Sequence, residues 1–102
     1  MSSGPLHIAC LQTRPMATMA EAIDEAVPMA EAAVTDGAEM LFLPEYCGGL
    51  ASDGARLCPP SDTEDRHEVL AALCDVARRR GVWVQVGSIA ISGLAILAPF
   101  RS

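Results

Sequence analysis

The sequence predicts an α/β domain in which three strands alternate with two helices in the order β-α-β-α-β. Three apolar runs have the length and composition of strands, at residues 6–12, 40–43 and 82–89. Between them lie two segments whose apolar residues recur every three or four positions, as on one face of a helix. Such alternation is typical of a parallel sheet whose strands are joined by right-handed helical crossovers.

The first helix is expected to begin at Thr18, because Glu21 three residues later completes a capping box. Its buried face is predicted to consist of apolar residues spaced three or four apart: Ala20, Ile23, Val27, Ala30 and Val34. Pro28 has no N–H to bond the carbonyl of Asp24, so we expect a kink there. Gly37 is a natural helix end.

The second helix is expected to begin at Ser61, which forms a second capping box with Glu64. Its buried stripe is predicted from the same spacing: Val69, Leu70, Leu73, Cys74 and Ala77. Arg78–Arg80 fill the last turn, where positive charge suits the helix dipole, and we interpret them as a solvated helix end rather than an anion site. Gly81 ends the helix, and residues 46–60 are predicted to form a loop.

Composition excludes several classes of function. The 102 residues fit one small domain, and 51% of them are apolar, which is enough to bury a core. The formal charge of −6 argues against nucleic acid and anionic membranes as partners. Residues 82–100 carry no charge, but Gln85, Ser88 and Pro99 interrupt them. We therefore expect a buried strand there rather than a membrane span.

The four cysteines predict reduced thiols in a cytoplasmic protein. Their spacing contains no C-x-x-C pair, and no secretory leader opens the chain. His7 and His67 do not cluster with them, so we expect no metal site. Cys10 lies in a predicted strand and Cys74 on a predicted apolar stripe, and both are expected in the core.

Glu45 is the candidate catalytic residue. It directly follows the strand at residues 40–43. In open parallel sheets, ligands bind beyond the carboxyl ends of the strands. A carboxylate there can serve as a general base, Tyr46 can exclude water on one side, and Cys47 lies two residues further on. Tyr46 and Cys47 are therefore candidates for a substrate pocket.

The segment Gly37–Tyr46, which reads GAEMLFLPEY, resembles the first signature of the nitrilase superfamily of carbon–nitrogen hydrolases. Residues 8–12 resemble the opening strand of that family, and residues 84–89 resemble its third strand. The resemblance covers about residues 6–91. It implies an α-β-β-α sandwich that hydrolyses amides or nitriles without a cofactor, through a Glu–Lys–Cys triad. Glu45 matches the glutamate, the general base for the cysteine nucleophile, while the lysine stabilises developing negative charge.

The chain departs from this pattern in two ways. It contains no lysine, and none of its cysteines stands where the family places the nucleophile. Cys47 is near Glu45 but lacks the nucleophile motif, and residues 92–102 stop resembling the family. We therefore expect residues 1–102 to be the N-terminal part of a hydrolase domain with a divergent tail, inactive alone. The apolar residues of that tail would be hard to bury in so small a unit: Leu94, Ile96, Leu97 and Phe100.

Two other interpretations of the sequence remain open. A non-catalytic binding or assembly module could pair with itself or with a full-length partner as a homo-oligomer. A flavodoxin-like or Rossmann domain is disfavoured, because no G-x-G-x-x-G follows the first strand and residues 12–15 (QTRP) make a poor phosphate cradle.

Overall fold

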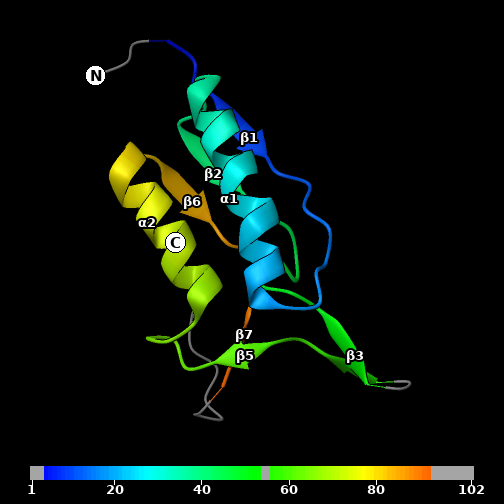
Figure 1. The fold of residues 1–102 in the computed structure, drawn as a ribbon. Helices are drawn as coiled ribbons and strands as arrows, with labels where there is room; N and C mark the ends of the chain where they lie inside the picture. Colours follow the sequence, from blue (N-terminus) through cyan, green and yellow to red (C-terminus); the bar gives the residue numbers. More distant parts are fainter. Residues whose placement is uncertain (1–3, 54–55, 93–102) are drawn as a thin grey trace.

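A computed structural model gives the fold, and it describes residues 4–53 and 56–92 (Figure 1). The chain is an α/β unit with two helices and short strands. The elements in chain order are β1 (Ile8–Cys10), α1 (Met19–Thr35), β2 (Met40–Phe42), β3 (Ala51–Asp53), β4 (Arg56–Cys58), β5 (Ser61–Asp62), α2 (Glu68–Arg80), β6 (Trp83–Gln85) and β7 (Ala90–Ile91).

The main sheet confirms the predicted β-α-β-α-β order. Its three strands are parallel and lie in the order β1-β2-β6. Ala9, Leu41 and Val84 are aligned across it. The strands are shorter than the apolar runs that predicted them, although hydrogen bonds of His7, Leu11 and Leu43 continue the pairing beyond the strand ends.

Only one face of this sheet is covered. Both helices lie on the same side of it in Figure 1. Leu41 is 0% exposed beneath them, whereas on the opposite face Ile8 is 54% and Trp83 68% exposed. The expectation of a buried strand within residues 82–100 is therefore correct for only one face of β6, and β1 is likewise exposed on one face. In the described part of the chain no element packs on the second face.

The first helix begins as predicted. The backbone N–H of Glu21 donates to Thr18 Oγ1 at 3.2 Å, and the helix runs without interruption through Pro28 to Thr35. Its most buried residues are alanines at Ala22, Ala26 and Ala30, one position away from part of the predicted stripe. These small side chains let α1 lie close to α2 and to the sheet. Gly37 follows the helix at φ +106°, as predicted.

The second helix begins later than predicted. Ser61 and Asp62 form strand β5, which pairs in parallel with β7, and α2 starts at Glu68 after an N-cap at His67. The proposed capping box of Ser61 and Glu64 is therefore wrong. Pairing with residues far along the chain outweighs the local capping signal at Ser61, and the ring of His67 supplies the cap instead. Gly81 ends the helix at φ +64°, as predicted.

The segment predicted as a loop, residues 46–60, also contains regular structure. Strands β3 and β4 form an antiparallel hairpin in which Ala51 pairs with Cys58. Short strands without an apolar alternation gave no signal for it. The apolar tail residues from Leu94 to Phe100 lie outside the described residues.

Candidate functional site

Glu45 lies at the carboxyl end of β2. After β2, Leu43 continues beside β6 and its N–H donates to the carbonyl of Gln85 at 2.9 Å. Leu43 is buried, but Pro44 turns the chain away and Glu45 is exposed. The carboxylate therefore stands at the edge where the parallel strands end, the part of such sheets where ligands bind.

A tight turn fixes the backbone directly after Glu45. Tyr46 has φ +57°, a left-handed conformation that is unusual for a residue with a side chain. Its N–H donates to Ser88 Oγ at 2.9 Å, and its carbonyl accepts from the N–H of Gly49 at the same distance. The hydrogen bond to Ser88 ties the turn to the segment that follows β6.

The contact between these two segments depends on Gly87. A Cβ at this position would lie 2.5 Å from the carbonyl oxygen of Leu43 and from the carbonyl carbon of Pro44. Only glycine allows this close approach, because any side chain would push the backbone of Pro44 outward. Gly87 therefore sets the distance between Glu45 and the segment that carries Ser88.

Glu45 and Tyr46 border a shallow hollow of about 330 Å³. Its other lining residues come from three segments: Gly49, Pro59, Ser88, Ile89 and Ala90. The hollow combines one carboxylate, one phenol and one hydroxyl with apolar walls. A carboxylate in such a place can accept a proton from a nucleophile, but no cysteine is among the described residues that line the hollow.

Cys47 does not face this hollow. Its side chain is 2% exposed, and Sγ lies 3.6 Å from the carbonyl oxygen of Ser88, to which the thiol donates. Burial raises the pKa of the Cys47 thiol, so it stays protonated at neutral pH. The sequence places Cys47 near Glu45 along the chain, but the turn at Tyr46 directs its side chain into the core.

The expectation that Cys10 and Cys74 lie in the core is wrong. Cys10 and Cys74 are both exposed, and all four thiols are free. Cys10 lies on the uncovered face of the sheet. The buried residues of α2 are Val69, Leu73 and Val76, and Cys74 lies on the neighbouring side of the helix. The predicted stripe of α2 is therefore wrong at Cys74 and omits Val76, whereas Cys10 lies in a strand as predicted, on a face that no described element covers.

His67 is a polar core residue that the sequence analysis did not single out. It is 0% exposed, and its Nδ1 accepts from the N–H of Leu70 at 3.3 Å. This bond requires an unprotonated Nδ1, so the neutral ring carries its hydrogen on Nε2. Burial lowers the pKa of His67, while the carboxylates of Asp62 and Glu68 oppose the shift. A histidine directly before an apolar helical stripe was the available signal.

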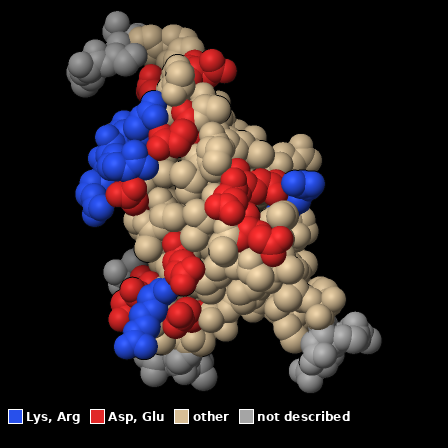
Figure 2. Space-filling model, in the orientation of Figure 1, with Lys and Arg blue, Asp and Glu red and all other residues tan. Residues whose placement is uncertain are grey.

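The three arginines at the end of α2 form ion pairs on the surface. Arg79 bonds Asp75 at 2.6 Å and Glu31 at 3.0 Å, and Arg80 bonds Glu31. These contacts join the end of α2 to α1 and agree with the interpretation of a solvated helix end. Figure 2 shows basic side chains gathered over this end of α2, with acidic side chains directly beside them.

Within residues 4–53 and 56–92, no group of three histidine, cysteine or acidic side chains is arranged to hold a metal ion. Neither described helix has the length and apolar character needed to cross a bilayer.

Comparison of the chain with protein-family models, with curated proteins and with solved structures gives no match in any of the three.

Proposed function

We propose that this chain is the N-terminal part of a cytoplasmic carbon–nitrogen hydrolase of the nitrilase type, with Glu45 as its general base. One observation carries the proposal. Glu45 follows β2 at the carboxyl edge of a parallel sheet, and the Tyr46–Ser88 hydrogen bond holds the turn beside a hollow that Glu45 lines. The resemblance of residues 37–46 to the signature of that family supplies the reaction.

In that reaction a cysteine thiol attacks the carbon of an amide or nitrile, and its proton passes to Glu45. With an amide, the carbon–nitrogen bond breaks, the nitrogen leaves with a proton, and water then cleaves the thioester. The second and third catalytic groups must come from outside this chain, because it has no lysine and the thiol of Cys47 points into the core. We therefore expect the purified chain alone to hydrolyse neither amides nor nitriles.

The uncovered sheet face supports the same proposal at the level of the fold. An α-β-β-α sandwich needs a second sheet packed on the side opposite the helices. Here that side carries Ile8, Met40 and Trp83 in register, an apolar row suited to sheet-on-sheet packing. The proposal therefore predicts that the missing part of the domain would cover this row.

A chimera tests the proposed role of Glu45. Residues 1–91 would be joined to the C-terminal part of an active carbon–nitrogen hydrolase, which supplies the lysine and the cysteine. We expect amide hydrolysis that falls at least about a thousandfold with Glu45→Gln. The matched control is Glu39→Gln, at the opposite end of β2, which should keep the activity. Equal loss in both variants, or activity that survives Glu45→Gln, would overturn the proposal.

The DNA downstream of the coding sequence gives an independent test. A Tyr-x-Lys segment and a cysteine at a strand-to-helix elbow, in another reading frame, would support the proposal of a shortened hydrolase.

A second candidate function, a non-catalytic assembly module, is favoured by the same exposed apolar face. A stable oligomer that associates through this face, and that Ile8→Asp dissociates, would favour the module, whereas aggregation through this face would favour the shortened enzyme.

A further inference from the structure

The outer edge of β6 has no partner strand among the described residues. In the order β1-β2-β6, β6 has a described neighbour on one side only. The N–H of Trp83 donates to Glu39 and the carbonyl of Gln85 accepts from Leu43, so these residues bond inward to β2. The intervening Val84 therefore turns its N–H and C=O outward. Residues 82–87 contain no charged residue or proline of the kind that protects an edge strand from pairing.

An apolar groove runs beside this edge. It has a volume of about 520 Å³ and lies between α2 and β6. Its walls include residues from both elements: Leu70, Cys74, Ala77, Val82, Val84 and Val86. Among the described residues that line it, Arg78 is the single charged one, and its side chain is 79% exposed. The groove and the edge together form one continuous surface along the outside of the molecule.

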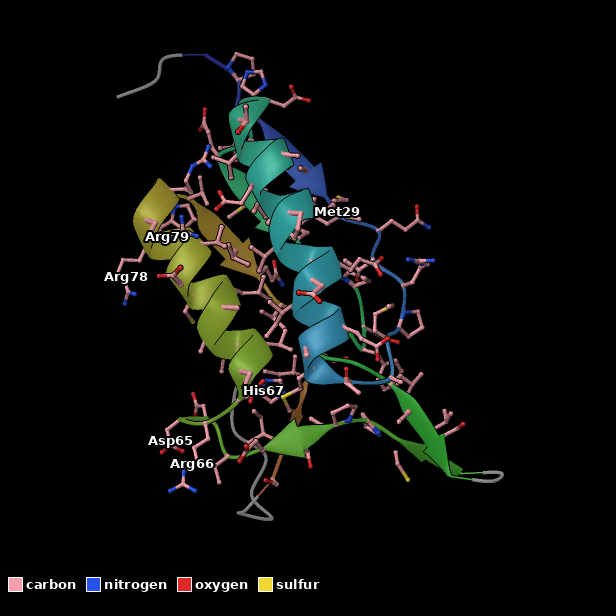
Figure 3. The ribbon with its side chains drawn as sticks, viewed as in Figure 1. Met29, Asp65, Arg66, His67, Arg78 and Arg79 are labelled. Atoms are coloured by element: carbon pink, nitrogen blue, oxygen red, sulfur yellow. The ribbon has the colours of Figure 1, made fainter. Side chains whose placement is uncertain are left out.

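The two ends of α2 carry opposite charge. Arg78, Arg79 and Arg80 form the C-terminal end, where three basic residues share the two carboxylates of Glu31 and Asp75. Four acidic residues and one arginine surround the N-terminal end: Asp62, Glu64, Asp65, Arg66 and Glu68. Figure 3 shows Asp65 and Arg66 below the first turn of α2, and Arg78 and Arg79 near its other end. A second α2 running in the opposite direction would place each basic end beside an acidic one.

We propose that the partner of this surface is a second copy of the same chain, paired antiparallel through β6 about a twofold axis. The outward N–H and C=O of Val84 bond the partner strand, and the two sheets of three strands become one sheet of six. The two α2 helices then lie side by side in opposite directions, and each closes the groove of the other. Opposite charges and opposite helix dipoles select this orientation, since a parallel arrangement would bring like ends together.

Sedimentation velocity of the full chain over a range of concentrations tests the proposal, together with the emission of Trp83, the single tryptophan. We expect a dimer whose dissociation shifts Trp83 emission to longer wavelength and becomes easier as salt rises. Cys74→Arg fills the groove with a charge and should raise the Kd at least about tenfold. Cys74 is exposed, so the monomer should tolerate the change.

Three further variants distinguish this dimer from other assemblies. Ala71→Arg lies on the same helix and is also exposed, but it does not line the groove, so its Kd should stay unchanged. Ile8→Asp, on the open face of the sheet, should also leave the Kd unchanged. Arg78→Glu should raise the Kd about threefold at low salt, and the difference should disappear at high salt.

Four results would overturn the proposal. The chain could remain a monomer at every concentration. Cys74→Arg and Ala71→Arg could change the Kd equally. Ile8→Asp could dissociate a dimer that Cys74→Arg leaves intact, which would place the contact on the sheet face. Shielding of Trp83 in a monomer, independent of concentration, would assign the edge to another segment of the same chain.

Discussion

The two faces of the main sheet have similar composition and opposite surroundings. Under the helices, Leu41 is 0% and Val84 6% exposed, whereas on the other face Ile8 is 54% and Trp83 68% exposed. Neighbouring residues of one strand, such as Val84 and Trp83, therefore differ in burial although both are apolar. An apolar run therefore predicts a strand, but it does not predict which face of that strand another element covers.

The covered face holds the described fold together. Small residues of α1 and larger residues of α2 meet Leu41 and Val84 in one core. The open face adds little to folding, because its side chains remain in contact with water. Stability measurements on paired variants, one in the covered region and one at an exposed position, should therefore separate residues that stabilise the fold from residues that add little to it.

The largest effect is expected for Leu41→Ala. Removing a fully buried leucine side chain leaves a cavity and should lower the free energy of unfolding by about 3 kcal/mol. Ile8→Ala, on the open face, should lower it by about 0.5 kcal/mol. Urea denaturation followed by circular dichroism measures both. Similar losses would mean that the open face is covered in solution.

The next effect is expected for Gly87→Ala. The added Cβ would meet the carbonyl of Leu43 at 2.5 Å, so the backbone must move, at a cost of about 2 kcal/mol. Gly81→Ala has open space around it and suffers only from its positive φ, which costs about 1 kcal/mol. A Gly87→Ala variant as stable as Gly81→Ala would contradict the close contact beside Glu45.

A smaller effect follows from pH. Because burial lowers the pKa of His67 below the ordinary value of 6.5, the unfolded chain binds a proton more readily than the folded chain. The contribution of His67 is therefore complete above about pH 6.5 and is lost as the pH falls from there toward its lowered pKa. Protonation also removes the acceptor that caps α2.

The control for this pH dependence is the exposed His7. Denaturation between pH 7.5 and 5 is expected to show a weaker decline in His67→Asn, whose side chain can still cap the helix, than in the parent chain. His7→Asn should follow the parent. An unchanged decline in His67→Asn would assign the pH dependence to other groups.

The smallest effect is expected for Glu31→Gln. This carboxylate joins α1 to Arg79 and Arg80 of α2, and both guanidinium groups hold its pKa below the usual range. The contacts lie at the surface, where water and salt screen them. The thermal midpoint should fall slightly at low salt and by less at 1 M salt, in parallel with Asp75→Asn. A loss as large as that of Leu41→Ala would place this cluster in the core.

Much of the candidate site could be predicted, since its position depends on chain order. The run at residues 40–43 followed by Pro44 places Glu45 at the carboxyl end of a parallel strand, and the structure has it there. The hydrogen bond from Tyr46 to Ser88 and the close approach of Gly87 could not be predicted. Both join residues more than forty positions apart, and no local pattern encodes their distance.

Several local features follow from the amino-acid sequence alone: the Thr18 cap, the helix ends at Gly37 and Gly81, and the alternation of strands and helices. Each depends on hydrogen bonds or backbone angles within a few residues. The start of α2 after His67, the inward direction of Cys47 and the exposure of Cys10 and Cys74 depend instead on tertiary contacts, because burial and strand pairing involve distant segments. Pairing with β7 makes Ser61 a strand residue, and no described element covers the second face of the apolar sheet.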